Sequence, residues 1–359
     1  MISIILPDLR PGGAERLHVN LADEWAHAGV STEFVLQNAT GELLGHLPAS
    51  AKVVDLKSAR IRSVLWRLVE YLKESKPNAI IVAMWPLTIL APFAARLAGY
   101  KGRVLISEHS PLSIAYGRYG RLHRLMMRAS QRMCYPLADV RVAVSCGIAD
   151  DLATLSGLPR EQFTVIHNPA ALGKVNVNAA CPEQLSGCPG PIILTVGTLK
   201  PVKRHDLLIE AFSRLPASLS ATLCILGEGQ MREQLERQID GLGLHGRVLL
   251  PGFSLDPGPW YAHSDLFVLS SDYEGFGNVI VEAMEYGLPV VSTDCPVGPT
   301  EILEQGRYGR LVSPANVEAL ASGMLASLRE EPDRDALKRR ARDFSLDVIA
   351  QQYLDVMFR

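Results

Sequence analysis

Residues 270–284 have the sequence SSDYEGFGNVIVEAM and directly follow an apolar stretch, 265–269, that we predict to be a β-strand. The two glycines after this strand allow a tight turn and a close approach of the backbone to a ligand. Asn278 is a favourable cap for a helix that we predict over 278–286. A strand, a glycine loop and a helix in immediate succession indicate one βα unit of a parallel sheet.

The beginning of this helix is a candidate anion site, because the N–H groups at a helix N-terminus favour phosphate oxygens. Glu282 is placed to accept hydrogen bonds from a ribose diol, and Glu274 precedes the glycines where a sugar would lie. The structural alternative makes Glu282 a partner of the helix dipole and Glu274 a solvated loop residue. The candidate nucleotide-sugar contacts of this segment are Gly275, Phe276, Gly277, Asn278, Val279 and Glu282.

The same alternation of strands and helices extends over all 359 residues, a length that favours two domains. Strands are predicted at 2–6, 33–37, 52–56, 79–83, 103–107, 140–144 and 163–166, and again at 191–196, 221–226, 247–250, 265–269, 289–293 and 308–312. Helices of the second half are predicted at 205–214, 230–241, 278–286, 298–304 and 316–329. We therefore predict an α/β fold of two doubly wound, Rossmann-like domains whose strand ends face a central cleft.

The predicted boundaries divide the chain into four parts. Residues 1–168 form the N-terminal, acceptor-side domain, and 191–334 form the C-terminal, nucleotide-binding domain. Between them, 169–190 is rich in Pro, Asn, Ala and Gly and shows no helical or strand period, which is typical of a linker. The last stretch, 335–359, has apolar residues at helical spacing and is predicted to pack back onto the N-terminal domain.

Composition favours an ordinary globular enzyme: 48% of the residues are hydrophobic, 21% are charged, and the net charge is -2. This balance does not favour a nucleic-acid partner. The apolar stretches have the length of strands, and no basic segment with a cleavage site is present at the N-terminus, so a cytoplasmic location is expected. The six cysteines are scattered, which predicts reduced thiols and no four-ligand metal site.

A second glycine turn follows the first predicted strand, in the sequence PDLRPGGAER at residues 7–16. Gly12 and Gly13 open a helix there and are candidates for contact with the nucleotide-sugar. The spacing is not Gly-x-Gly-x-x-Gly, so a nicotinamide cofactor is not favoured. A purely structural turn remains the alternative.

The ordered set of motifs resembles glycosyltransferase family 4, the retaining nucleotide-sugar enzymes of GT-B architecture. The motifs are GGAER at 12–16, VGTL at 196–199 with Lys203, LGEG at 226–229, Glu274 and Glu282 separated by seven residues, GLPVV at 287–291 and GPTEIL at 298–303. They span nearly the whole chain. The resemblance implies a GT-B fold and transfer of a sugar from a nucleotide diphosphate donor with retention of configuration.

The resemblance also implies roles for individual residues of the second domain. Glu274 would contact hydroxyls of the transferred sugar, Glu282 the ribose, and Lys203 the diphosphate. Where the family usually has an arginine, after the glycine of the second domain's first strand, this chain has Thr198. Arg204 is the preferred replacement for that charge, because it adjoins Lys203 and a departing diphosphate must be stabilised. Lys200 is the alternative.

In the first domain, Ser107-Glu108-His109-Ser110 follows a predicted strand. In some relatives a histidine at this strand end lies beside the transferred sugar, where its ring or a backbone carbonyl stabilises positive charge at the anomeric carbon. The resemblance makes His109 the candidate, with Glu108 as the other polar group. A lone histidine at a strand end also fits a structural role.

Residues 116–133 form a basic segment that we predict to be helical. Arginines recur there at steps of three and four residues, on a different face from Leu122, Leu125, Met126, Ala129 and Met133. Such a helix suits an anionic membrane surface and a lipid-linked saccharide acceptor. The alternative is a solvated basic face over an ordinary core face. The candidate acceptor or membrane residues are Arg118, Arg121, Arg124, Arg128 and Arg132.

These observations predict a retaining hexosyl- or N-acetylhexosaminyltransferase of surface glycan biosynthesis, peripheral on the inner face of the membrane. UDP is the first choice of donor nucleotide. No cofactor is expected, and no strict metal requirement, because no Asp-x-Asp pair follows a strand. A UDP-sugar epimerase of the same fold and a non-enzymatic sugar-binding module remain alternatives.

Overall fold

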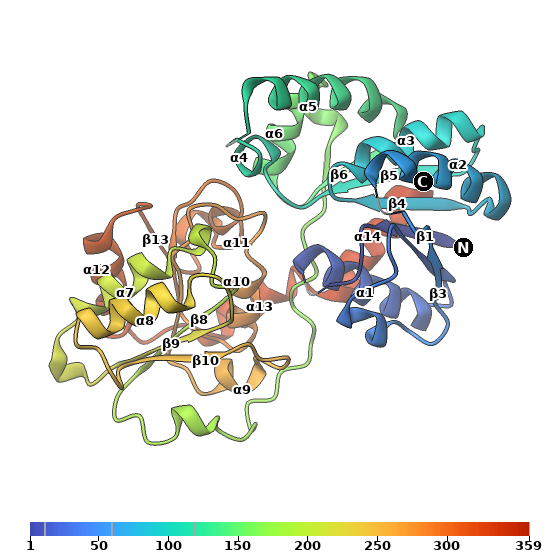
Figure 1. Cartoon of the computed structure of the whole chain (residues 1–359). Helices are drawn as coiled ribbons and strands as arrows, with labels where there is room; N and C mark the ends of the chain where they lie inside the picture. Colours follow the sequence, from blue (N-terminus) through green and yellow to red (C-terminus); the bar gives the residue numbers. More distant parts are fainter. Residues whose placement is uncertain (11, 59, 118, 359) are drawn as a thin grey trace. The chain divides into compact units, whose positions relative to one another are not determined.

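A computed structural model describes residues 1–10, 12–58, 60–117 and 119–358 (Figure 1). The chain forms two compact units. Unit 1 contains Met1–Pro169 together with the C-terminal segment that begins at Leu346, and unit 2 contains Ala170–Ser345. No helix among the described residues combines the length and the apolar character needed to span a bilayer.

Unit 1 is built on a seven-stranded parallel sheet in the order β3-β2-β1-β4-β5-β6-β7. Its strands are β1 Ile2–Leu6, β2 Thr32–Leu36, β3 Lys52–Asp55, β4 Ala79–Ala83, β5 Arg103–Glu108, β6 Val140–Ala143 and β7 Thr164–Val165. Its helices are α1 Gly13–His27, α2 Ile61–Ser75, α3 Leu87–Ala98, α4 Leu112–Ala115, α5 Arg121–Cys134, α6 Cys146–Ser156 and α14 Leu346–Phe358. Every residue of β1, β2 and β4 is buried, as expected for parallel strands covered on both faces.

The order of the strands reverses beside β1. Ile5 of β1 is paired with Val35 of β2 on one side and with Val82 of β4 on the other. The chain therefore winds from β1 toward β3 and then returns to continue from β4 toward β7. Such a switch point places the loops after β1 and β4 at the edge where open α/β sheets bind ligands.

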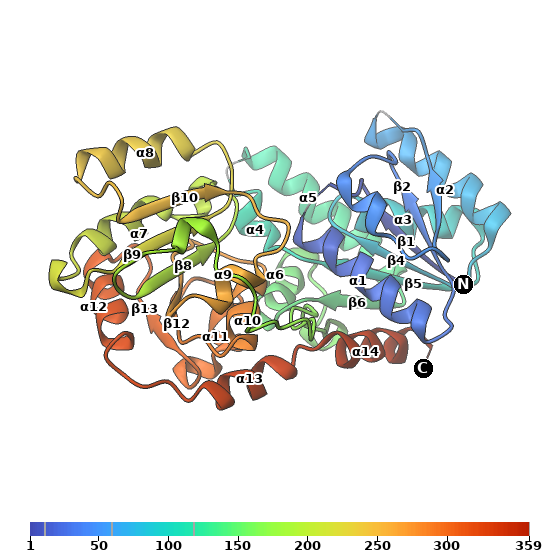
Figure 2. The same ribbon diagram turned by 90° about the horizontal axis from the view of Figure 1, so that it is seen from below.

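The C-terminal helix α14 belongs to the core of unit 1, where it lies beside α1 (Figure 2). Trp25 of α1 donates a hydrogen bond from Nε1 to the carbonyl of Ala350 at 3.1 Å, and its ring meets Tyr353 edge-on with centroids 6.4 Å apart. Ile349, Tyr353 and Met357 are at most 1% exposed. Residues from the two ends of the sequence thus share one core.

Unit 2 has a six-stranded parallel sheet in the order β10-β9-β8-β11-β12-β13, with its switch point between β8 and β11. Its strands are β8 Ile192–Val196, β9 Thr222–Leu226, β10 Val248–Gly252, β11 Leu266–Leu269, β12 Val290–Thr293 and β13 Arg310–Val312. Its helices are α7 His205–Ser213, α8 Arg232–Gly241, α9 Gly258–Ala262, α10 Asn278–Glu285, α11 Pro299–Ile302, α12 Val317–Ser327 and α13 Arg334–Arg342.

Two predicted segments differ in detail from the structure. The stretch predicted as one terminal helix consists of α13, which packs on α10 in unit 2, and α14, which lies in unit 1. The proposed linker is not detached: Gly173 N–H donates to Glu285 Oε1 at 2.6 Å, and His263 Nε2 lies 2.8 Å from the carbonyl oxygen of Ala179. Most of the segment is therefore held against unit 2.

Candidate functional site

Lys203 and Glu274 form an ion pair at the switch point of unit 2. Lys203 ends the 3-10 turn Pro201–Lys203 that follows β8, and Glu274 lies in the loop after β11. Lys203 Nζ donates to both carboxylate oxygens, at 2.7 and 2.9 Å, and Ser271 Oγ donates to Oε1 at 2.6 Å. The side chains are 21% and 11% exposed. Two predicted site residues, 71 positions apart, are thus brought together.

Hydrogen bonds to backbone carbonyls hold the two loops together. Ser270 Oγ donates to the carbonyl of Lys203 at 2.8 Å, and the N–H of Asp272 donates to the carbonyl of Val202 at 2.8 Å. Thr293, at the end of β12, donates from Oγ1 to the carbonyl of Ser271 at 2.7 Å. A site held by such contacts is ordered before any ligand arrives, which reduces the free energy spent on reorganisation.

Arg204 has carboxylate partners of its own. Its guanidinium lies 3.1 Å from Asp206 and 3.1 Å from Asp272, and the hydrogen bond with Asp206 raises the pKa of the arginine. Its backbone is left-handed, with φ 49°. Thr198, where the family arginine would stand, is exposed at the end of β8. Arg204 as the replacement cation stays a proposal, since a ligand phosphate would compete with two carboxylates for it.

Two glycines let strand-end loops touch backbone to backbone. A Cβ at Gly227 would lie 1.9 Å from the carbonyl oxygen of Gly197, and a Cβ at Gly298 would lie 2.0 Å from that of Phe276. Gly298 also has φ 100°, which strains any other residue. Side chains at these positions would push the loops of the site apart.

Helix α10 begins at Asn278, and Gly277 occupies the cap position with φ 103°. The prediction that Asn278 caps this helix is therefore wrong, because the left-handed glycine turns the chain one residue earlier. Phe276 is 2% exposed and packs edge-on against Phe344 at 5.3 Å, so its ring belongs to the core and not to the ligand side. Gly275 and Val279 flank this turn on either side.

Glu282 is the fifth residue of α10 and is half-buried. The hydroxyl of Tyr261, a residue of α9 with 1% exposure, donates to Glu282 Oε2 at 2.8 Å. Tyr261 in turn stacks on Tyr286 with centroids 5.6 Å apart. Tyr261 was not predicted from the sequence, since nothing in its spacing from Glu282 marks it as a partner. The contact fixes the orientation of the carboxylate.

In unit 1, the predicted glycines stand at the start of α1. Gly12 is the N-cap residue, and Gly13 is the first residue of the helix. A Cβ at Gly12 would lie 2.2 Å from the Glu15 carboxylate. A side chain here would displace Glu15 at the carboxyl end of β1, beside the switch point.

His109 follows β5 and contacts a second histidine that sequence analysis missed. Its ring meets that of the fully buried His18 edge-on, with centroids 5.5 Å apart, and its Nε2 lies 3.1 Å from Ser107 Oγ. Burial lowers the pKa of His109 to about 3 and that of His18 to about 4. Both rings are therefore neutral near pH 7. Ser107 Oγ also lies 3.3 Å from the hydroxyl of Tyr353 in α14.

Glu108 is enclosed by side chains of unit 1. Its Oε1 accepts hydrogen bonds from Thr88 Oγ1 at 2.5 Å and from the Tyr135 hydroxyl at 2.8 Å. Burial raises the pKa of Glu108 to about 7, and both hydrogen bonds oppose that rise. The carboxyl faces the interior of the unit, so His109 remains the better candidate for contact with a substrate.

Helix α5 exposes both its arginines and its large apolar side chains. Leu122, Leu125, Met126 and Met133 are 71%, 64%, 64% and 73% exposed. The residues that α5 buries are Met127, Gln131 and Cys134. The alternative that the apolar stripe forms a core face is therefore wrong. Arg121, Arg124, Arg128 and Arg132 are exposed, and Arg118 lies outside the described residues.

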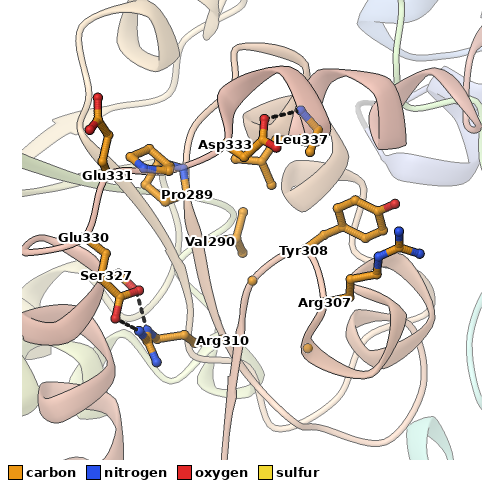
Figure 3. A pocket seen from close by; sticks show the side chains of 14 residues that line it. Pro289, Val290, Arg307, Tyr308, Arg310, Ser327, Glu330, Glu331, Asp333 and Leu337 are labelled. Atoms are coloured by element: carbon orange, nitrogen blue, oxygen red, sulfur yellow. Dashed lines mark hydrogen bonds and ion pairs between the residues drawn. The ribbon is translucent and has the colours of Figure 1, made fainter.

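A cavity of about 340 Å³ lies in unit 2 where β12 and β13 begin (Figure 3). On one side Arg310 donates to Ser327 Oγ at 3.1 Å and to Glu330, and Tyr308 lies on the other side. This is the opposite sheet edge from Lys203 and Glu274, which follow strand ends. None of the predicted site residues lines the cavity.

Comparisons with known proteins agree over both units. The model "Glycosyltransferase Family 4" matches residues 11–173, and "Glycosyl transferases group 1" matches 184–344. N-acetylgalactosamine-N,N'-diacetylbacillosaminyl-diphospho-undecaprenol 4-alpha-N-acetylgalactosaminyltransferase of Campylobacter jejuni is 31% identical over 248 residues, which cover 69% of this chain and 66% of that one.

A full-length relative and a solved structure extend this finding. The lipopolysaccharide core biosynthesis glycosyltransferase LpsE of Rhizobium meliloti is 29% identical over 97% of this chain and 96% of its own. The Anabaena protein HepE, solved in complex with UDP and glucose, superposes with a TM-score of 0.80 at 23% identity, covering 99% of this chain and 98% of that one.

Proposed function

The chain belongs to glycosyltransferase family 4 and has the GT-B fold, and from this premise we propose that it transfers a sugar from a nucleoside diphosphate donor to a saccharide acceptor. The observation that carries the proposal is the Lys203–Glu274 pair, held at the switch point of unit 2 ahead of the glycine turn into α10. UDP is the proposed nucleotide, supported by the UDP complex of HepE.

In this proposal the donor is held by groups of unit 2. The half-buried Glu282 carboxylate, oriented by Tyr261, accepts hydrogen bonds from the ribose diol. The beginning of α10 favours the negative diphosphate. Lys203 neutralises phosphate charge, and Glu274 binds hydroxyls of the transferred sugar. The ion pair keeps both charges partnered while the site is empty, and each charge then exchanges its partner for a group of the donor.

Transfer breaks the bond between the anomeric carbon and the diphosphate oxygen and forms a bond to an acceptor hydroxyl, whose proton is released. Negative charge grows on the leaving diphosphate, where Lys203 and the proposed Arg204 stabilise it. Positive charge grows on the anomeric carbon. His109 suits that carbon because a neutral ring does not repel a cation. We propose retention of the anomeric configuration, in line with the retaining family that the motifs resemble.

The proposed acceptor is a lipid-linked saccharide of surface glycan biosynthesis. The Campylobacter relative is named for a diphospho-undecaprenol-linked substrate, and the Rhizobium relative for lipopolysaccharide core biosynthesis. The exposed leucines, methionines and arginines of α5 support docking on an anionic membrane surface. A peripheral position on the inner face of the membrane follows from this proposal.

The experiment is a thermal-shift screen of UDP, GDP, ADP and dTDP, followed by their common sugars. UDP and one UDP-sugar are expected to raise the melting temperature of the wild type more than that of Glu282→Ala, whereas GDP has no comparable effect. If none of the diphosphates shifts the transition, the donor proposal fails.

Product analysis then separates transfer from the alternatives. NMR of the product should show a new glycoside with the anomeric configuration of the donor, formed equally well with EDTA present. Free UDP together with an isomerised sugar would instead establish an epimerase. Binding of sugars without affinity for a nucleotide would establish a binding module.

A further inference from the structure

Four aromatic side chains gather in unit 1 and belong to no part of the site described so far. Trp85, Tyr116, Tyr119 and His123 form this aromatic cluster. The Trp85 ring lies 4.8 Å from Tyr116 and 5.6 Å from His123, centroid to centroid. His123 is stacked with Tyr119 at 4.6 Å and with Tyr116 at 5.9 Å. The rings therefore form one packed cluster, in which Trp85 meets Tyr116 and His123 edge-on.

The cluster lies at the strand-end edge of the sheet. Trp85 follows β4, directly at the switch point between β1 and β4, and Tyr116 follows the α4 turn after β5. His123 stands on the first turn of α5. A backbone hydrogen bond joins Trp85 to the Glu108 carboxyl. The cluster is thus built from the segments after β4 and β5, close in sequence to His109. It is attached to Glu108, the residue before His109.

Two polar atoms of the cluster have no partner. Trp85 Nε1 and His123 Nε2 are buried, and neither makes a hydrogen bond within the described chain. An unsatisfied buried donor or acceptor costs on the order of 1–3 kcal/mol, a cost that a ligand hydroxyl would remove. The neighbouring ring of Tyr119 is 54% exposed, so it can shift to admit a ligand to these nitrogens and still pack on that ligand.

We infer that the aromatic cluster is the subsite for a pyranose ring of the acceptor. A pyranose has an apolar face of C–H groups, which packs on aromatic rings, and equatorial hydroxyls at its edge, which would satisfy the ring nitrogens of Trp85 and His123. This inference rests on the proposed function and adds the residues that recognise the acceptor sugar. The structure supplies both halves of the recognition, the 54% exposed ring of Tyr119 and two unused polar groups.

A lipid surface is a poorer match for the same cluster. Leu122 and Leu125, which α5 exposes at 71% and 64%, lie on a different face of the helix from the half-buried His123. Insertion into lipid would also leave the two ring nitrogens without partners. Substitutions in the cluster are therefore expected to affect saccharide binding, and substitutions on the exposed face of α5 to affect membrane binding.

The test uses the full chain and saturation-transfer NMR with methyl α- and β-glycosides of Glc, Gal, GlcNAc and GalNAc and with the matching disaccharides. Tyr119→Ala is expected to weaken binding at least threefold, and Tyr119→Phe to preserve it. Trp85→Phe keeps a ring but removes the donor, and it should also weaken binding. Phe253→Ala, which removes a 57% exposed ring in unit 2, is the matched control and should bind like the wild type.

UDP thermal shifts and vesicle binding are measured in the same variants, so that a failed subsite, a membrane role and a failed proposed function can be distinguished. Loss of saccharide binding in Tyr119→Ala, with UDP and vesicle binding intact, supports the subsite. A wild type that binds UDP but none of the saccharides, or a Tyr119→Ala variant equal to wild type, overturns it. Loss of phosphatidylglycerol vesicle binding in Tyr119→Ala, with saccharide binding intact, would assign the cluster to the membrane. A wild type without UDP binding would refute the proposed function instead.

Discussion

Glu282 and Glu274 lie in the same βα unit but have different partners. Removal of each carboxylate is therefore expected to affect UDP affinity and turnover differently. Glu282 accepts a hydrogen bond from the Tyr261 hydroxyl at 2.8 Å, whereas Glu274 is paired with Lys203. Glu282→Ala should weaken UDP binding by roughly 1–3 kcal/mol through loss of charge-assisted hydrogen bonds. Calorimetric titration measures it, with the exposed Glu233→Ala on α8 as control. Wild-type UDP affinity in folded Glu282→Ala would remove the ribose assignment.

Glu274→Ala should lower turnover more than it lowers affinity for free UDP, because its proposed partner is the sugar. The variant also leaves Lys203 without its carboxylate, which favours the diphosphate and makes a loss of UDP affinity still less expected. Turnover and UDP titration are measured on the same preparation. An equal loss in both quantities would contradict the role.

Glu108 gives the fold a measurable pH dependence. Burial raises its pKa from 4.5 to about 7, so between these values the folded protein keeps a proton that the unfolded chain loses. The stability contributed by the neutral carboxyl is complete below about pH 4.5 and is lost as the pH rises through 7. Over this window the loss is on the order of 3 kcal/mol.

Glu108→Gln removes this titration. Its free energy of unfolding minus that of wild type should increase from pH 5 to pH 7.5 and then stay level. Denaturant titrations at each pH measure it, and the histidines cancel in the difference. The control is Glu70→Gln, the same change at an exposed position of α2, and it should not reproduce the rise expected for Glu108→Gln. Parallel curves for Glu108→Gln and wild type would show that the carboxyl does not titrate there.

For single residues, the sequence predicted the unit in which a residue lies better than it predicted the side chains that this residue contacts. The order of motifs placed Lys203, Glu274 and Glu282 in one unit, and the structure brings the first two together. Tyr261 and His18 were not predicted, because a side chain that reaches a site from another element leaves no period in the sequence. The cap at Gly277 was missed since it depends on a positive φ, which the neighbouring Asn278 also tolerates.

At the scale of single helices, the exposed arginines of α5 lead to a prediction about membrane binding. Replacing its four described arginines by Gln should reduce binding to phosphatidylglycerol liposomes, because each contributes roughly 1 kcal/mol of attraction to an anionic surface. The effect should shrink as salt is added. The variant replaces Arg121, Arg124, Arg128 and Arg132, and the control replaces Arg237, Arg329, Arg339 and Arg342, four exposed arginines of unit 2. Co-sedimentation measures both.

Only the α5 variant should lose liposome binding, and UDP affinity should be unchanged in both. Wild-type protein that ignores these liposomes at low salt would end the membrane proposal, and a soluble saccharide acceptor would then be favoured. Equal losses in the two variants would show a general charge effect without a docking helix.

Helices and strands could be predicted from the sequence where a single physical rule determines them. Each predicted strand is present, with ends displaced by at most two residues, because buried parallel strands need continuous apolar runs. The break between α13 and α14 could not be predicted. An amphipathic pattern shows which residues are buried but not in which of the two cores they lie. The same limit applies to α5, whose apolar stripe is exposed.

At the scale of the whole molecule, α14 decides whether unit 1 is complete. Deletion of 346–359 removes Ile349, Tyr353 and Met357 from its core, and burial of such side chains contributes roughly 1.5–3 kcal/mol each. That sum approaches the total stability of an ordinary domain. Unit 1 should unfold or become protease-sensitive while unit 2 stays folded and binds UDP. Phe358→Ala, at a 55% exposed position, should behave as wild type.

Limited proteolysis with mass spectrometry, together with UDP titration, measures both halves of this prediction. Cleavage sites should concentrate before residue 169 in the deletion variant. A protease-resistant unit 1 in that variant would show that α14 is dispensable for its core.

The placement of α14 also sets the order in which the protein can be made. Unit 2 is complete once Ser345 has left the ribosome, yet unit 1, which begins the chain, still lacks its last helix. At about 5–20 residues per second, the roughly 180 residues between Pro169 and Leu346 hold the first unit unfinished for on the order of ten to forty seconds. During that time the surface around Trp25 that α14 will cover is open to chaperones. The order of translation therefore leaves this part of the unit 1 core uncovered until α14 has been made.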